Sequence, residues 1–197
     1  MFNRAITKEL EAWKNKEDRK PLMMLGARQV GKTSVLKRFG KEQFDNCAYF
    51  SLDEEKGVSD IFRTTKNPLQ IIEQLSFLTE EPILPQKTLI VLDEIQDCPE
   101  AIGAMKYFCE KAPEYAVACA GSLLGLAFGH EGFSFPVGKV DHINMYPVTF
   151  SEFLEQKDSG LYRYYKSINS LEPLPQVFFD RLSQAFTAYR ISGGMPE

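Results

Sequence analysis

GARQVGKT, residues 26–33, decides the fold: Gly26 and Gly31 lie five residues apart, and Lys32 and Thr33 follow directly. The spacing fits G-x-x-x-x-G-K-[ST], the Walker A pattern of a phosphate-binding loop. Glycines let successive backbone N–H groups point into one small volume, and a helix beginning at Lys32 adds unpaired N–H groups and the positive end of its dipole. Lys32 supplies a full charge for the outer phosphates, and the Thr33 hydroxyl is suited to ligate magnesium.

The sequence on either side of this loop has the form that the motif requires. The apolar run at residues 22–25 predicts a buried strand before the loop, and residues 32–39 predict a helix after it. A glycine-containing connection that arose by chance would lack this context. We therefore expect a nucleotide to contact the following residues: Gly26, Ala27, Arg28, Gln29, Val30, Gly31, Lys32, Thr33 and Ser34.

Two other apolar runs end in polar residues. TLIVLDE, residues 88–94, predicts a strand at whose tip Asp93 holds magnesium through water, while Glu94 orients the water that attacks the terminal phosphate. The alternative is an acidic turn after a buried strand. Ser122 follows the run AVACAG, and its hydroxyl is a candidate catalytic contact to the γ-phosphate or the attacking water. Ordinary Gly-Ser turn chemistry is the competing interpretation.

The rest of the chain alternates short apolar runs with helical patterns. Weaker or shorter strands are predicted at residues 46–52 and 139–147, and helices at 2–13, from 67, from 99, from 149 and at 177–191. Thr149 and Glu152 fit a capping box, whereas the polar residues 157–175 predict a loop or linker. This alternation predicts an α/β fold with a parallel sheet covered on both faces.

Composition and charge narrow the classes of function. The net charge of −4 argues against a general nucleic-acid binder, although residues 1–41 carry eleven Lys or Arg against four Asp or Glu. The cluster Lys14, Lys16, Arg19 and Lys20 predicts a solvated helix end, with a DNA-backbone contact as the weaker alternative. Four cysteines without a C-x-x-C pair predict reduced thiols in the cytoplasm. The longest apolar run has 12 residues, too few to span a bilayer.

Two other nucleotide-binding classes fit less well. Residues 15–18 spell N-K-x-D, the guanine-reading signature of GTPases, but they precede the phosphate loop and follow a helix instead of a buried strand. The strand that ends at Asp93 also lacks the glycine of D-x-x-G. A small-molecule kinase would gather arginines in a lid, whereas Arg163, Arg181 and Arg190 are scattered. The adjacent Asp93 and Glu94 favour water as the acceptor.

Six motifs, in their order along the chain, resemble those of a family of prokaryotic AAA-type ATPases. They are GARQVGKT, LIVLDEIQDCPE, AGSLLG, FPVGKV, MYPVTFSEFL and ISGGMPE. Its longer members carry a C-terminal nuclease-like domain. The resemblance implies a P-loop NTPase fold with three α/β/α layers, strand order 5-1-4-3-2, and a helical lid beginning near residue 150. It implies that Lys32 and Thr33 hold phosphate and magnesium and that Asp93 holds the magnesium. It also implies that Glu94 holds the attacking water and that Ser122 is the sensor of nucleotide state. Where members often carry Gly-Arg, this chain has Gly138-Lys139, and lysine lacks the forked guanidinium of an arginine finger.

Together these features predict an ATPase core at residues 1–156, followed at 157–197 by a linker and the start of a truncated lid. The expected ligands are ATP and Mg²⁺, and the expected partners are a second copy of the chain or another protein, with no membrane. The expected activity is hydrolysis of ATP to ADP and phosphate. The alternative is a nucleotide-binding switch with negligible turnover alone, acting through a missing C-terminal domain or a partner.

Overall fold

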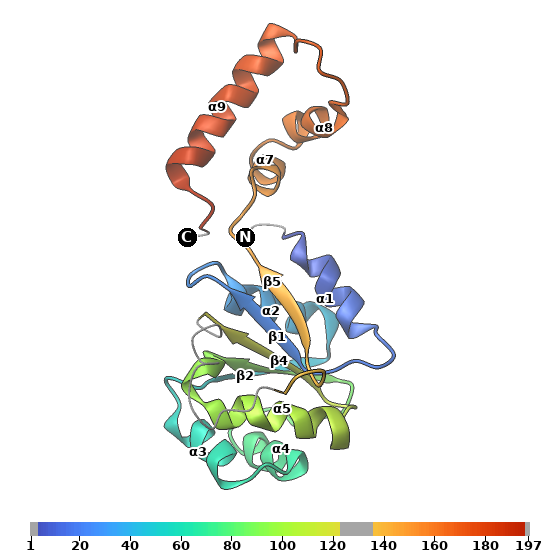
Figure 1. The fold of residues 1–197 in the computed structure, drawn as a ribbon, viewed down its shortest axis with the longest axis vertical. Helices are drawn as coiled ribbons and strands as arrows, with labels where there is room; N and C mark the ends of the chain where they lie inside the picture. The colour runs from blue at the N-terminus through green and yellow to red at the C-terminus, as the bar shows by residue number, and fades with distance from the viewer. Residues whose placement is uncertain (1–3, 123–135, 196–197) are drawn as a thin grey trace.

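A five-stranded parallel sheet lies at the centre of the computed structural model, which describes residues 4–122 and 136–195 (Figure 1). Its strand order is β2-β3-β4-β1-β5, so the predicted order 5-1-4-3-2 is confirmed. Strand β1, which leads into the phosphate loop, pairs with β4 on one side and β5 on the other. The strands are β1 (Leu22–Gly26), β2 (Asn46–Ser51), β3 (Thr88–Asp93), β4 (Ala116–Gly121) and β5 (Asp141–Met145).

Helices cover both faces of the sheet, as the alternation of strands and helices predicts. Figure 1 shows α3 (Lys56–Thr64), α4 (Pro68–Ser76) and α5 (Pro99–Lys111) below the sheet. The opposite face carries α1 (Ile6–Lys14) and α2 (Lys32–Gln43). A short 3-10 helix, η1 (Ile95–Asp97), follows β3.

Each face of the sheet has its own hydrophobic core. Met23 packs with the core of α3, α4 and α5, whereas Leu22 and Met24 pack with that of α1 and α2. This division follows from the pleat, which points successive side chains of a strand to opposite faces. All six residues of β3 and of β4 are buried, so both faces of these strands need apolar side chains, and their sequences contain continuous apolar runs.

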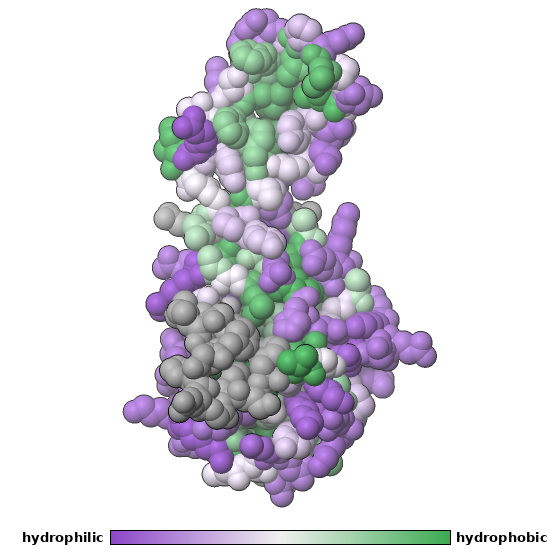
Figure 2. Space-filling view, in the orientation of Figure 1, coloured by the Kyte–Doolittle hydropathy of each residue, from purple (hydrophilic) through white to green (hydrophobic). Residues whose placement is uncertain are grey.

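Beyond β5 the chain forms a helical unit, which we define as α7 (Phe150–Lys157), α8 (Ser159–Ser167) and α9 (Gln176–Ser192). It stands apart from the sheet in Figure 1. Its helices meet through aromatic rings, and Phe150 lies 5.3–5.7 Å from the rings of Tyr165, Phe186 and Tyr189. Figure 2 shows hydrophobic residues gathered on its surface, and α9 has no buried residue. None of the described helices is long and apolar enough to cross a membrane.

The prediction of a loop at residues 157–175 is wrong in its first half. Helix α8 occupies Ser159–Ser167, and the Asp158 side chain caps it by accepting a hydrogen bond of 2.9 Å from the Leu161 N–H. Only Leu161 of this helix is buried, and its other large side chains are mostly tyrosines, so its amphipathic pattern is not marked by aliphatic residues. The capping box of Thr149 and Glu152 at the start of α7 is confirmed. Helix α3, after β2, was not predicted.

The close contact between α2 and β2 gives a test of the packing. A Cβ on Gly40 would lie 2.5 Å from the Cys47 Sγ and 2.7 Å from its Cβ, whereas a Cβ on Gly103 of α5 would meet nothing within 4 Å. We expect Gly40→Ala to lower the free energy of unfolding by about 1–3 kcal/mol through overpacking. The control Gly103→Ala should raise it by about 0.5–1 kcal/mol, because alanine favours a helix. Urea titrations measure both values, and a stabilised Gly40→Ala would contradict the packing.

Candidate functional site

The loop between β1 and α2 requires glycine at both ends of the motif, for different reasons. A Cβ on Gly26 would lie 2.3 Å from the Met145 carbonyl oxygen, because β1 and β5 approach closely there. Gly31 has φ 94°, and Gln29 has φ 62°, both in the left-handed region. Alternation of left- and right-handed backbone turns N–H groups toward one side of a loop and makes an anion-binding nest. The backbone of residues 26–33 therefore has the form that a phosphate cradle needs.

Lys32 begins α2 and folds back over the loop. Its Nζ donates hydrogen bonds to the carbonyl oxygens of Gly26 (2.9 Å) and Ala27 (2.8 Å), and the residue is only 7% exposed. Burial lowers the pKa of Lys32, while the negative charges of Glu94 and Asp93 oppose this shift. The ammonium thus lies within the loop and is held by neutral acceptors, which a more strongly negative phosphate oxygen can replace.

Asp93, at the tip of β3, is the centre of a hydrogen-bonded group. The Thr33 Oγ1 donates to its Oδ2 at 2.6 Å, although the two residues are 60 positions apart in sequence. The carboxyl ends of parallel strands lie side by side along one end of a sheet, which we call its carboxyl edge. The first turn of α2 meets the tip of β3 there. The structure therefore brings together the two residues predicted to hold magnesium, and Asp93 is buried with 5% exposure.

Tyr49 of β2 belongs to this group and was missed by the sequence analysis. Its hydroxyl donates to the same Asp93 Oδ2 at 3.1 Å, and the Lys37 Nζ lies 3.2 Å from the centroid of its ring. Burial, followed by the charge of Asp93 and the hydrogen bond to it, raises the pKa of Tyr49 to about 12. The phenol therefore stays protonated and acts as a donor. The only available signal was its place in the apolar run NCAYFSL, which is equally typical of a core aromatic.

Glu94 directly follows Asp93 in an unusual conformation. Its φ of 49° places a non-glycine residue in the left-handed region, and such backbone strain is concentrated at functional sites. Its N–H donates to the Asp93 Oδ1 at 3.1 Å, and its own Oε2 accepts a hydrogen bond of 2.6 Å from the Gln96 Nε2. The carboxylate that is predicted to orient water thus lies next to Asp93 and accepts a hydrogen bond from the side-chain amide of Gln96.

Ser122 follows the last residue of β4, and the preceding Gly121 pairs with Leu25 of β1. The serine therefore lies at the same edge of the sheet as the phosphate loop. Much of the motif AGSLLG lies outside the described residues, since residues 123–135 are not among them.

Lys139 lies at the opposite end of the strands, where they begin, which we call the amino edge of the sheet. Its Nζ forms an ion pair of 2.9 Å with Glu110, near the end of α5, and β5 begins at Asp141 just after it. The paired register of β1 and β5 runs from Leu22–Asp141 to Gly26–Met145, so the full length of β1 separates Lys139 from the loop. Lys139 does not reach the phosphate site of its own chain.

The N-K-x-D tetrapeptide also lies at this amino edge. Lys16 forms an ion pair of 2.8 Å with Asp141, and Lys20 donates from its Nζ to the Gly138 carbonyl oxygen at 2.8 Å. Lys14 bonds the Gln43 carbonyl oxygen, and the Arg19 guanidinium lies 5.7 Å from the Trp13 ring. These contacts are compatible with the predicted solvated helix end, because Lys16 is exposed and the other three cations are only partly buried. Their position opposite the phosphate loop also excludes a guanine-reading role for this tetrapeptide at that loop.

A glycine-rich loop between a central parallel strand and a helix, beside an acidic strand tip, defines a P-loop NTPase fold. A family model described as an AAA domain matches residues 18–154. The chain therefore belongs to the AAA domain family, as the resemblance in its motifs indicates.

Solved structures agree on the fold. The chain is similar to the Walker-type ATPase of Pyrococcus abyssi, with a TM-score of 0.57, 18% identity, and coverage of 100% of this chain and 65% of that one. It is also similar to PCH-2 of C. elegans, with a TM-score of 0.50, 14% identity, and coverage of 95% and 59%. The chain thus spans less than two thirds of either protein. Comparison with proteins of curated function finds no significant match.

The raised pKa of Tyr49 predicts how stability depends on alkaline pH. Between pH 10.0, its ordinary pKa, and about 12, the folded chain keeps the phenolic proton that the unfolded chain has lost. The free energy of unfolding therefore falls as pH rises through this window. We expect a shallower fall in Tyr49→Phe, measured by urea titration at several pH values. An unchanged slope in Tyr49→Phe would contradict the raised pKa of Tyr49.

Proposed function

We propose that this chain is a magnesium-dependent ATPase domain that hydrolyses ATP to ADP and phosphate. The observation that carries the proposal is the 2.6 Å hydrogen bond between Thr33 and Asp93, beside the loop that Lys32 occupies. A hydroxyl and a carboxylate from two separate segments converge where the outer phosphates of a bound nucleotide lie in a P-loop protein. Membership of the AAA domain family supports ATP as the nucleotide.

The oxygen atoms at this position fit magnesium. Mg²⁺ is usually held by one or two carboxylates together with substrate phosphates and waters, not by an all-protein cage. Accordingly, the residues that the structure describes contain no group of three or more His, Cys, Asp or Glu that could hold a metal by themselves. Thr33 would bind the ion directly and Asp93 through water. The bound ion neutralises charge that develops on the phosphate oxygens.

We assign each residue a role from where it lies. Backbone N–H groups of residues 26–34 bind the phosphates, and the Lys32 ammonium leaves the loop carbonyls to contact the outer ones. Glu94 orients a water and accepts its proton as the water oxygen bonds to the γ-phosphorus and the bond from phosphorus to the bridging oxygen breaks. Ser122 contacts the γ-phosphate or this water from the tip of β4.

A second candidate function is a nucleotide-binding switch that turns over negligibly alone. It is favoured by the hydrogen bond from Gln96 to the Glu94 Oε2, because this contact competes with water for one oxygen of the carboxylate. The remote position of Lys139 also supports completion of the site by a positive residue of a second copy or a partner protein. A role on nucleic acid has little support, because the basic cluster contacts the chain itself. The four free cysteines support a cytoplasmic location.

Phosphate release from Mg-ATP tests the proposal. We expect Glu94→Gln to lower turnover by about 100-fold or more, since a general base contributes this much, and to keep its affinity for ATP. Glu73→Gln, an exposed glutamate of α4, is the matched control and should keep full turnover. Lys32→Ala should lose binding of the fluorescent analogue mant-ATP.

The same assay, run over a range of protein concentrations, separates the candidate functions. Turnover per chain that rises with concentration supports a site completed by a second copy. Retained nucleotide without turnover at any concentration supports the switch. Equal turnover in Glu94→Gln and the unmodified chain would remove Glu94 from the mechanism, and unaltered mant-ATP binding in Lys32→Ala would refute the nucleotide site.

A further inference from the structure

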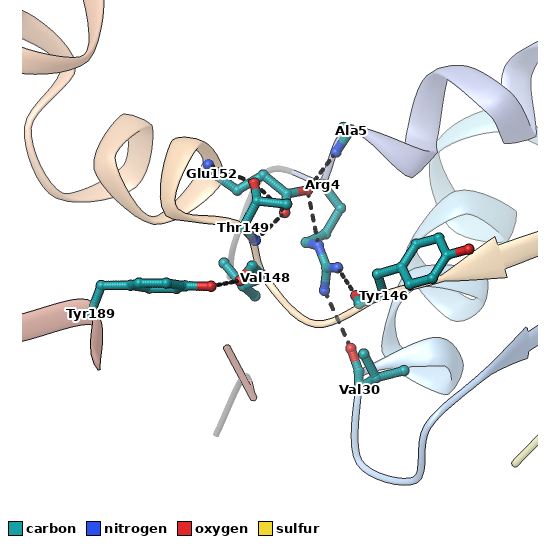
Figure 3. A network of polar contacts seen from close by, with 8 residues as sticks. All are labelled: Arg4, Ala5, Val30, Tyr146, Val148, Thr149, Glu152 and Tyr189. Carbon is teal, nitrogen blue, oxygen red and sulfur yellow. Dashed lines mark hydrogen bonds and ion pairs between the residues drawn. The ribbon is translucent and has the colours of Figure 1, made fainter. Parts of the chain in front are cut away.

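Arg4, just before α1, is almost fully buried although it carries a charge, with 8% of its surface exposed. Figure 3 shows its guanidinium between three segments that are far apart in the sequence. It donates to the Val30 carbonyl oxygen at 3.2 Å, to the Tyr146 carbonyl oxygen at 2.5 Å and to the Glu152 Oε1 at 3.2 Å. One side chain thus connects the phosphate loop, the end of β5 and the first turn of α7.

The contact with Val30 bears directly on the phosphate cradle. The Val30 carbonyl and the Gly31 N–H belong to one planar trans peptide, in which the two groups point in opposite directions. A guanidinium that holds the carbonyl on one side therefore aims the Gly31 N–H toward the other side. Residues 29 and 31 both have left-handed backbone, so the orientation of this peptide is part of the nest. A charged partner on the carbonyl also polarises the peptide and strengthens its N–H as a donor.

Glu152 fixes the other end of the connection. Its Oε1 accepts from the Arg4 Nε and from the Ala5 N–H at 2.9 Å, and its Oε2 accepts from the Thr149 N–H at 2.8 Å. Burial alone would raise the pKa of this carboxyl, but the backbone hydrogen bonds and the charge of Arg4 outweigh it, so the pKa lies below 4.5. Glu152 is therefore charged at neutral pH, and the pair joins α1 to α7 through a buried ionic contact.

The helical unit is anchored beside this pair. The Tyr189 hydroxyl of α9 donates to the Val148 carbonyl oxygen at 2.8 Å, and the Val148 N–H donates to the Gly194 carbonyl oxygen at 2.6 Å. Figure 3 shows Val148 and Tyr189 next to the Arg4 network. The start of α7 and the end of α9 therefore both meet the connector between β5 and α7. Tyr146, the first residue of this connector, is bound by Arg4.

We propose that Arg4 is a positioning residue that aligns the phosphate loop and couples nucleotide binding there to the placement of the helical unit. The inference rests on the proposed function, because it assigns a regulatory connection to the same nucleotide site. A coupling of this kind is reciprocal. Loss of the contact on the helical side must therefore weaken nucleotide binding, even where the altered residue lies away from the loop.

Two conservative variants and one control test the coupling. Arg4→Lys keeps the charge but lacks the fork that reaches three acceptors. Glu152→Gln removes the charge of a residue whose carboxylate bonds Arg4, Ala5 and Thr149 and not the loop. Arg38→Lys is the matched control, because Arg38 forms an exposed pair of 2.7 Å with Glu42 within α2. Circular dichroism verifies that each variant is folded.

The measurements are mant-ATP affinity with Mg²⁺ and hydrogen–deuterium exchange with and without Mg-ATP. In the unmodified chain and in Arg38→Lys, we expect nucleotide to slow amide exchange both at residues 27–31 and at residues 146–154. Arg4→Lys and Glu152→Gln should each weaken mant-ATP binding at least about fivefold, the lower end of typical couplings. They should also abolish the nucleotide effect at residues 146–154 and, without nucleotide, speed exchange at residues 27–31.

The outcomes separate this inference from the proposed function. If the unmodified chain binds mant-ATP but Glu152→Gln leaves both affinity and loop exchange unchanged, the coupling is wrong and the nucleotide site stands. A nucleotide effect at residues 146–154 that persists in Arg4→Lys equally overturns it. If the unmodified chain does not bind mant-ATP, the proposed function fails, and the link between the loop and the helical unit is decided by exchange without nucleotide.

Discussion

The carboxylate of Asp93 is the contact on which the site depends. Its Oδ1 accepts from the Glu94 N–H, and its Oδ2 accepts from the hydroxyls of Thr33 and Tyr49. These donors come from β2, from α2 and from the residue after β3, so one buried carboxylate holds three segments of the chain together. A parallel sheet is what makes this geometry available, because it brings the ends of distant strands to one edge.

The sequence predicted the sheet and much of this edge, for physical reasons. Buried parallel strands need continuous apolar runs, and these runs fix where strands β1, β3 and β4 end. The polar residues that follow them then fall at one edge, and Thr33 and Asp93 do lie within hydrogen-bonding distance. The functions of these residues remain proposals, whereas their placement together is observed.

The features that could not be predicted depend on tertiary partners. Nothing in the neighbourhood of Tyr49 distinguishes a hydrogen-bond donor from a core aromatic, since Asp93 approaches it from another strand. Two of the three acceptors of Arg4 are backbone carbonyls, which every residue carries and no sequence pattern marks. Helix α8 has a cap at Asp158 and a single buried leucine, and tyrosines supply most of its amphipathic pattern, so the segment is easily taken for a polar loop.

The attachment of the helical unit has a mechanical consequence. Tyr189 and Gly194, at the C-terminal end of the unit, both hydrogen-bond Val148, and the first helix of the unit begins at Phe150, just after it. The unit is therefore attached over a short segment, and the far end of α9 extends away from it. The 17 residues of α9 span about 25 Å at the helical rise of about 1.5 Å per residue. A rotation of about 10° at this segment would carry the far end of α9 through about 4 Å. Through the connection that we propose for Arg4, a displacement of a loop peptide that is too small to disturb the sheet would become a movement of this size at the far end of α9.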